Sequence, residues 1–378
     1  IYTCNNCNKG GPGGRATRQK PKNSGSVKPP LDGIKVVEIA TIIAAPLGSS
    51  FLADMGAEVI KIEPVGGDPF RGLLMGLGSA RVNGGKRSIG LNLKSDEGKQ
   101  IVLDLIKSAD VLIHNFRPGV PERLGIGYDT VRELNPSIVY LQSNGYGPDG
   151  PGALRPSAHP IPGAAMGGVV YQMGEKLPSE VQDMENLRLW TKRLMRANEV
   201  NPDPNTAMVV CTSVMLGLMA RKTTGEGQQI FMDMFGANAY ANHDDFLSYP
   251  GKKPRALADD LMHGLSPTYR LYQCDNNEWI FLALVTDREK ARFLEILGKA
   301  GIDCSQLSPS EMEEESVIVK LADLFKTRSA SDWEGLLAHK GIGCVRADGL
   351  TPSLFWLADE QAQSMNLTKN STYPEWGD

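Results

Sequence analysis

The side chain best placed for covalent chemistry is Asp203, which stands between Pro202 and Pro204 just before a long apolar segment. The pattern predicts an N-cap, with Pro204 at the first helical position. A carboxylate at a helix N-terminus faces unpaired backbone N–H groups and the positive end of the helix dipole. Those groups are also suited to an oxyanion formed when a carbonyl is attacked. Asp203 is therefore a candidate nucleophile, and the capping role is compatible with that chemistry.

The cysteines offer a second candidate site, but a weak one. Of six cysteines, only Cys4 and Cys7 lie close together in the sequence. No second pair and no nearby His completes the four ligands of a zinc site. Six cysteines in a chain of this length also do not indicate a disulfide framework. We therefore expect no metal, and interpret the pair as part of a reduced tail.

Size and charge exclude several classes of function. A chain of 378 residues exceeds the size of a single core and predicts two domains. Its net charge is -4 with both signs interspersed, so nucleic acid is not an expected partner. The longest apolar stretch, residues 208–220, is shorter than the roughly 18–20 residues of a membrane span. No secretory signal pattern opens the chain, so we expect a cytoplasmic protein without a membrane partner.

The elements that position Asp203 follow an alternating strand and helix pattern. Residues 34–39 predict a buried strand, 46–55 a helix and 58–62 a second strand, which together form a βαβ unit. Helix and strand patterns alternate again over residues 96–113 and 129–141. This alternation predicts an α/β fold with a Rossmann-like, doubly wound large domain. The glycine fingerprint for dinucleotides is missing after the first strand, which argues against NAD chemistry.

A smaller α/β domain is predicted from the later part of the chain. Strands are expected at 269–272, 279–283 and 343–345, with helices at 288–298 and 331–339. The expected division is a flexible arm or linker at 1–29, a large domain at 30–227, a connecting segment at 228–262, a small domain at 263–345, and a segment at 346–378 that returns to the large domain.

Several spaced motifs resemble one known family. They are LDGIKVVE at 31–38, AAP at 44–46, LADMGAEVIKIE at 52–63, GKRSI at 85–89, NFRPG at 115–119, RLG at 123–125, NP at 135–136, GYG at 145–147 and TGEGQ at 224–228. The sequence is similar in these motifs to family III CoA transferases, the group of formyl-CoA:oxalate and carnitine CoA transferases. The resemblance covers roughly residues 30–375.

The resemblance implies a reaction and a set of site residues. Asp203 would attack an acyl-CoA thioester, giving a mixed anhydride and then an aspartyl-CoA thioester, from which CoA passes to a carboxylic acid. Coenzyme A would act as a co-substrate, as acyl-CoA. Its contacts by resemblance are Ile43, Ala44, Leu91, Asn92, Lys94, Asn115, Phe116, Arg117 and Arg123. Arg117, Arg123 and Lys94 suit phosphate, although isolated charged residues are more often solvated surface groups.

Departures from the family pattern bear on the substrate. Ser157 and His159 stand where oxalate-using members carry Lys and Tyr, so oxalate and formate are not expected substrates. His159 is a candidate acceptor contact or a structural residue, and Gly264 remains from the small-domain glycine run. The racemase branch carries an acid after this His, where Pro160 stands here.

Three functions therefore stay open: an acyl-CoA:carboxylate CoA transferase, an acyl-CoA racemase, and a non-catalytic half of a tandem enzyme. Asp203 favours the first over the third, and Pro160 favours it over the second. The resemblance also implies an interlocked homodimer or a tandem pseudo-dimer.

Overall fold

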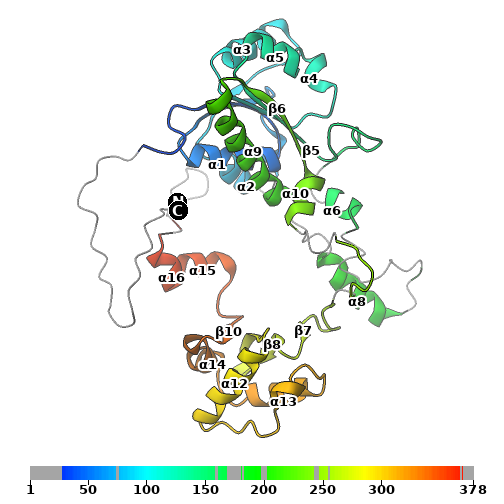
Figure 1. Ribbon diagram of the computed structural model, residues 1–378, viewed down its shortest axis with the longest axis vertical. Coiled ribbons are helices and arrows are strands. Elements are labelled where there is room, and N and C mark those ends of the chain that lie inside the picture. The colour runs from blue at the N-terminus through cyan, green and yellow to red at the C-terminus, as the bar shows by residue number, and fades with distance from the viewer. Residues whose placement is uncertain are drawn as a thin grey trace, which may run out of the picture. The chain divides into compact units, whose positions relative to one another are not determined.

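The computed structural model divides into two compact units (Figure 1), and it describes residues 28–73, 76–157, 161–167, 180, 183–196, 202–241, 247–253, 256–366 and 368. The first unit comprises Ile1–Gly167 and Asn198–Leu247, and the second comprises Gly168–Ala197 and Ser248–Asp378. Cys4, Cys7 and His159 lie outside the described residues.

The first unit is built on a six-stranded sheet in which every neighbouring pair of strands is parallel. The strand order is β3-β2-β1-β4-β5-β6. Its strands are β1 (Lys35–Ile39), β2 (Glu58–Glu63), β3 (Arg87–Gly90), β4 (Val111–His114), β5 (Val139–Asn144) and β6 (Gln228–Asp233). The order runs outward in both directions from β1 and β4, which confirms the doubly wound α/β prediction.

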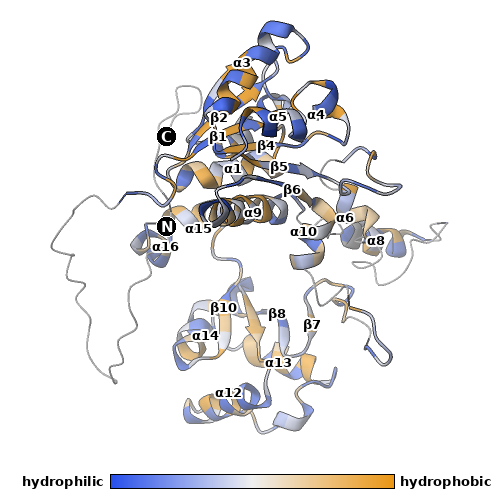
Figure 2. Cartoon of the chain, turned by 45° about the horizontal axis from the view of Figure 1, so that its top comes forward, coloured by the Kyte–Doolittle hydropathy of each residue, from blue (hydrophilic) through white to orange (hydrophobic). Residues whose placement is uncertain are grey.

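Helices cover both faces of this sheet. Its helical segments are α1 (Ala44–Asp54), η1 (Pro69–Gly72), α2 (Leu77–Val82), α3 (Asp96–Lys107), α4 (Val120–Arg123), α5 (Tyr128–Leu134), α6 (Ile161–Ala165), α9 (Pro202–Thr224) and α10 (Met234–Ala241). One core joins α1, α9 and α10 to one face, and a second core joins α3 and α5 to the other. Alternate residues of a strand point to opposite faces, so Val36 enters the first core and Val37 the second. Hydrophobic colouring runs along α9 (Figure 2).

Helix α9 begins two residues earlier than the sequence pattern predicts, at Pro202 instead of Pro204. Pro202 is its first residue, and Asp203 lies in the first turn, so the prediction of Asp203 as N-cap is wrong. A proline fixes φ and lacks an N–H, which suits the first helical position. Pro202 is therefore the proline that opens the helix. Asp203 still lies at the end of α9 where backbone N–H groups have no intrahelical partner.

The second unit contains an antiparallel sheet of order β10-β9-β8-β7. Trp333 and Phe325 are fully buried in its core, and the Trp333 indole N–H donates to the Phe325 carbonyl oxygen at 2.8 Å. The elements of this unit are α8 (Met184–Arg196), β7 (Gly264–Ser266), β8 (Tyr269–Gln273), η3 (Asp275–Asn277), β9 (Trp279–Ala283), α12 (Asp287–Lys299), η4 (Pro309–Glu311), α13 (Val317–Phe325), α14 (Ala330–Leu337), η5 (Ala338–Lys340), β10 (Gly343–Arg346), α15 (Pro352–Ala358) and α16 (Glu360–Ser364).

The observed units differ in extent from the domains expected from sequence. The first unit continues past residue 227, because β6 completes its sheet and α10 packs on α9. The return of residues 346–378 to the large domain stays a prediction. Among the described residues, no helix combines the length and the apolar character needed to cross a membrane.

Close packing of α1 against α9 makes Gly48 a sensitive position. A Cβ atom there would lie 2.6 Å from Cγ1 of Val210 and 2.9 Å from the Ala207 carbonyl oxygen. We predict that Gly48→Ala lowers the free energy of unfolding by about 1–3 kcal/mol, because the added methyl forces the two helices apart. Urea unfolding followed by circular dichroism measures the change.

The matched control is Gly298→Ala in α12, where a Cβ atom would meet nothing within 4 Å. This change should raise stability by about 0.5–1 kcal/mol, since alanine favours the helical backbone. Equal effects of the two substitutions would contradict the packing argument.

Candidate functional site

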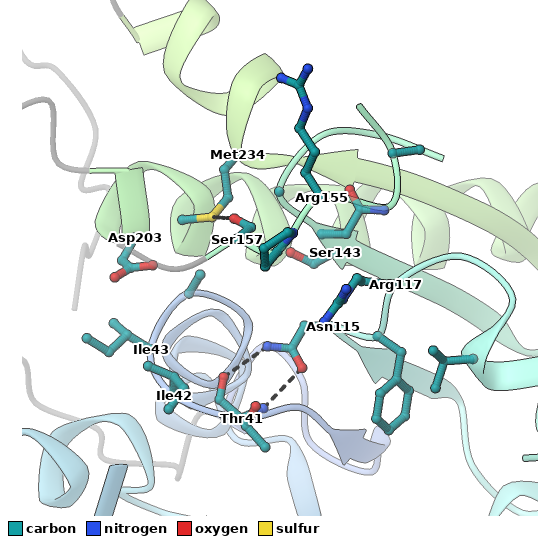
Figure 3. Close-up of a pocket in the computed structure, with 17 residues that line it drawn as sticks. Thr41, Ile42, Ile43, Asn115, Arg117, Ser143, Arg155, Ser157, Asp203 and Met234 are labelled. Atoms are coloured by element: carbon teal, nitrogen blue, oxygen red, sulfur yellow. Dashed lines mark hydrogen bonds between the residues drawn. The ribbon is translucent and has the colours of Figure 1, made fainter. Parts of the chain in front are cut away.

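A pocket of about 420 Å³ opens beyond the carboxyl ends of the central strands (Figure 3). Parallel strands that alternate with helices place all these ends, and the first turns of the crossover helices, at one edge of the sheet. The pocket lies where the strand order changes direction, between β1 and β4. Its walls are formed by Thr41, Ile42, Ile43, Ala44, Asn115, Phe116, Arg117, Val120, Ser143, Asn144, Gly145, Ala153, Arg155, Pro156, Ser157, Asp203 and Met234.

Asp203 contributes a buried carboxylate to this pocket. Its exposed fraction is 5%, and Figure 3 shows it between Met234 and Ile43. Helix α9 is held on the sheet at Gly217, where a Cβ atom would lie 2.7 Å from Cγ1 of Val139. The position of Asp203 is therefore fixed by a helix that packs directly on β5. A carboxylate shielded from water next to a ligand-sized space is suited to nucleophilic attack.

Asn115 joins the loops that follow β1 and β4. Its side-chain Nδ2 donates to the Thr41 carbonyl oxygen at 2.9 Å, and its Oδ1 accepts the Thr41 N–H at 3.2 Å. The amide side chain thus satisfies both backbone groups of one residue, as a neighbouring strand would. The two loops are held together where the chain leaves the parallel strands β1 and β4 toward opposite edges of the sheet.

The loop after β1 has an unusual backbone. Ile42 has a φ of 71°, in the left-handed region that β-branched residues avoid. Its N–H points at the carboxylate of Asp68, with distances of 3.1 and 3.2 Å to the two oxygens. Ile43, the next residue, is the N-cap of α1 and makes no side-chain capping hydrogen bond. The left-handed residue therefore leads directly into the helix end that lines the pocket.

Asp68 belongs to a buried cluster of four charges beneath this loop. Lys61 Nζ lies 2.7 Å from Glu38 Oε1 and 2.9 Å from Asp68 Oδ2, and Lys86 Nζ lies 2.6 Å from Glu38 Oε2. Burial lowers the pKa of Lys86 to about 8, although Glu38 acts in the opposite direction. The cluster pairs two basic with two acidic side chains, which a buried site of this kind requires.

A second pocket of about 550 Å³ adjoins the first. Thr41, Phe116 and Val120 line both of them. The remaining walls of the second pocket are Ile39, Ile62, Glu63, Pro64, Val65, Leu91, Asn92, Leu93, Lys94 and Leu124. Its largely apolar surface, with Lys94 as the one basic residue among the described lining residues, suits a flat or apolar group that carries phosphate nearby.

Phe116, which lies between the pockets, is oriented by a buried histidine. The Tyr140 hydroxyl donates to the Ile126 carbonyl oxygen at 3.0 Å and therefore accepts from His114 Nε2, 2.9 Å away. This assigns the proton to Nε2 and leaves Nδ1 to accept the Phe116 N–H at 3.3 Å. Burial lowers the pKa of His114 to about 3, so the ring stays neutral. The ring of Phe116 stacks on that of His114.

The structure brings most of the predicted site residues together. The first pocket contains Asp203, Ile43, Ala44, Asn115, Phe116 and Arg117, and the second contains Leu91, Asn92 and Lys94. Arg123 is exposed on α4 and lines neither pocket. Gly264 lies in β7 of the second unit, and its backbone approaches Arg270 so closely that a Cβ atom would lie 2.1 Å from that of Arg270. His159 is outside the described residues.

Sequence reasoning missed other residues of the pocket. Ser143 and Asn144 end β5, and Thr41 follows β1, so their place at carboxyl ends of parallel strands could have marked them. Arg155 and Met234 carry no such signal. Among the described residues, no group of three or more His, Cys, Asp or Glu side chains is arranged to hold a metal ion.

A doubly wound sheet with a pocket at the change in strand order is typical of α/β proteins that bind nucleotides or coenzymes. The profile of CoA-transferase family III matches residues 31–375. The chain therefore belongs to that family, as the sequence motifs predict.

Three curated relatives illustrate the range of the family. An acyl-CoA transferase from Fusarium pseudograminearum is 38% identical over 54% of this chain and 45% of its own length. The succinyl-CoA--L-malate CoA-transferase beta subunit of Chloroflexus aurantiacus is 30% identical over 74% of this chain and 67% of its own. An alpha-methylacyl-CoA racemase from Mus musculus is 27% identical over 80% of this chain and 74% of its own. The match to the Fusarium protein thus spans less than half of that relative.

Solved structures share the fold. A crystal structure of a CaiB/BaiF family protein from Brucella suis superposes with a TM-score of 0.67 at 24% identity, covering 90% of this chain and 89% of that one. At this identity the likeness concerns the fold alone.

Glu63, which lines the second pocket, makes a pH-dependent contribution to stability. Arg71 donates two hydrogen bonds to it, at 2.6 and 2.8 Å, and this pairing, with Ser88 and the Asp68 N–H, lowers the pKa of Glu63 to about 2. A lowered carboxyl pKa stabilises the folded chain above the ordinary value of 4.5, and that stability is lost as pH falls from 4.5 toward 2. We predict that Glu63→Gln costs about 1–3 kcal/mol at pH 7, since Arg71 is half exposed, and progressively less at pH 4 and below.

Urea unfolding of both proteins at pH 7, 5 and 3.5 measures this difference. The control is Glu133→Gln, on the exposed side of α5, which should change stability by less than about 0.5 kcal/mol. A Glu63→Gln cost that stays constant down to pH 3.5 would contradict the ion-pair account.

Proposed function

We propose that the chain is an acyl-CoA:carboxylate CoA transferase whose nucleophile is Asp203. The observation that carries this proposal is the buried carboxylate of Asp203 in the pocket at the carboxyl edge of the sheet. A carboxylate is a weak nucleophile, but it can divide one difficult exchange into easier covalent steps. Family membership and relatives named as CoA-transferases support the same class of reaction.

The proposed reaction begins with attack of an Asp203 carboxylate oxygen on the thioester carbonyl of the donor acyl-CoA. The C–S bond breaks, leaving a mixed anhydride and the CoA thiolate. The thiolate then attacks the aspartyl carbonyl, which gives an aspartyl-CoA thioester and releases the donor as a free carboxylate. Each step forms one acyl bond and breaks another, so no oxidant and no net proton transfer are needed.

The second half of the reaction repeats these steps with the acceptor. The acceptor carboxylate attacks the aspartyl thioester, and the released thiolate attacks the acceptor's acyl carbon in the new anhydride. The products are a new acyl-CoA and the free carboxylate of Asp203. Backbone N–H groups in the first turns of α1 and α9 are suited to stabilise the oxyanions of these steps.

The two adjoining pockets support an extended mode of CoA binding. With its thioester at Asp203, the chain of CoA would pass Thr41 and Phe116, which line both pockets. Leu91, Asn92 and Lys94 would then contact the nucleotide end. Arg117 would meet a phosphate on this path, and Arg123 would do so at the exposed end.

A racemase is the alternative, because a racemase also belongs among the relatives. The two reactions leave different traces. We propose to incubate the protein with a panel of acyl-CoAs, quench it, and search by mass spectrometry for a CoA adduct on the peptide that contains Asp203. An adduct is expected, whereas exchange of the α-proton in D₂O without any adduct would favour the racemase and overturn the proposal.

We predict that Asp203→Asn lowers the rate of CoA transfer by at least about 10³-fold, roughly 4 kcal/mol in barrier, because an amide oxygen is a far poorer nucleophile. The free energy of unfolding should change by less than about 1 kcal/mol, since asparagine is tolerated at helix starts. Steady-state transfer assays and urea unfolding measure the two effects. Asp129→Asn, an exposed residue in the first turn of α5, is the control and should transfer CoA at the wild-type rate. Transfer by Asp203→Asn within tenfold of wild type would exclude the mechanism.

We predict that Arg117→Ala and Arg123→Ala each weaken CoA binding by about 10- to 150-fold, the value of one charge-assisted hydrogen bond of about 1.5–3 kcal/mol. The maximal rate should fall much less, because phosphate contacts are equal in the ground and transition states. Calorimetric titration with free CoA measures the affinity. The control is Arg132→Ala on the exposed side of α5, which should bind CoA normally. Unchanged affinity in both variants would remove these arginines from the site.

A further inference from the structure

We propose that Asp68 is a positioning residue. It holds Ile42 in its left-handed conformation and so fixes the loop that leads into α1, whose first residues line the same pocket as Asp203. This inference rests on the proposed function of Asp203. Asp68 does not line the first pocket, whereas Ile42 and Ile43 do. Any effect of Asp68 on the reaction would therefore be transmitted through the loop.

The backbone conformation of Ile42 must be stabilised by contacts with other residues. A β-branched residue at a φ of 71° is strained, and such strain persists only where the surroundings enforce it. Both carboxylate oxygens of Asp68 lie within hydrogen-bond distance of the Ile42 N–H. Asn115 holds Thr41, the preceding residue, by both of its backbone groups. The loop is thus restrained at two consecutive residues, once by a charge and once by an amide.

The carboxylate of Asp68 is itself held in place from several sides. Its exposed fraction is 2%. Lys61 Nζ lies 2.9 Å from Oδ2 and also donates to the Ala40 carbonyl oxygen at 2.7 Å, and Oδ1 accepts the Phe70 N–H at 2.9 Å. The backbone N–H of Asp68 donates to Glu63 Oε2 at 2.7 Å. A carboxyl group with this many fixed partners can hold a strained neighbouring residue in place.

A role in stability alone and a role in positioning predict different effects of an Asp68 substitution on folding and on reaction rate. If Asp68 served only to balance Lys61, its loss would weaken the whole fold and reduce the amount of active protein. If it positions the loop, the folded protein should bind acyl-CoA but react slowly, because small displacements of reacting groups cost large factors in rate. Glycine at position 42 would adopt a positive φ without strain and would not need the hydrogen bond to Asp68.

The experiment is a double-mutant cycle of Asp68→Asn and Ile42→Gly, read by the rate of CoA adduct formation on the peptide that contains Asp203. With Ile42 present, Asp68→Asn should lower the rate about 10- to 100-fold and change the KM for acyl-CoA by less than about threefold. With glycine at position 42, the same substitution should lower the rate by less than about threefold. Asp54→Asn, on the exposed side of α1, is the control and should react normally.

The outcomes are distinct. An equal loss of rate in both backgrounds, or a wild-type rate for Asp68→Asn, would overturn the inference while leaving Asp203 as nucleophile. Absence of any adduct on the wild-type protein would instead overturn the proposed function. If Asp68→Asn does not fold, Ile42→Pro provides the test, because it leaves the charged cluster intact but locks φ near −65°. A folded Ile42→Pro protein that forms the adduct at the wild-type rate would also overturn the inference.

Discussion

All neighbouring strands in the six-stranded sheet are parallel, and this constraint decides where a site can form. Each parallel connection must return to the same end of the sheet, so carboxyl ends of strands and first turns of crossover helices meet at one edge. The order also changes direction between β1 and β4, so the connections that follow these two strands lead toward opposite edges of the sheet. Thr41, Asn115, Asn144 and Asp203 meet at this opening although they are far apart in the chain.

The same sheet is buried on both faces, so charged side chains in its strands lower the stability of the fold unless they are paired. Glu38 in β1 and Lys61 in β2 are fully buried, and breaking such a pair leaves an uncompensated charge in the core. Here the cluster is balanced, and one of its members, Asp68, contacts the loop beside the pocket. Stability of the sheet and the shape of the site are therefore coupled through one set of buried charges.

The main elements of the fold could be predicted because their apolar patterns are long and clear. β1, β2, β4 and β5 are buried runs, and α3 is preceded by the N-cap Ser95, whose hydroxyl accepts the Gly98 N–H. β3 was missed because it is a short edge strand whose residues are mostly exposed, so it carries little periodic signal. The extent of the first unit was also missed, since nothing local in residues 228–233 shows that they pair with β5.

By itself, the sequence determined the family, the doubly wound order of elements and the candidate nucleophile, because motifs, periodicity and a proline-flanked Asp203 are local features. Only the tertiary structure decided that Pro202 opens α9, that Asn115 clamps Thr41, and that Asp68 holds Ile42. These contacts join residues from different strands and loops. Their energies depend on burial and on distances that no local pattern encodes, so they exist only once the sheet has assembled.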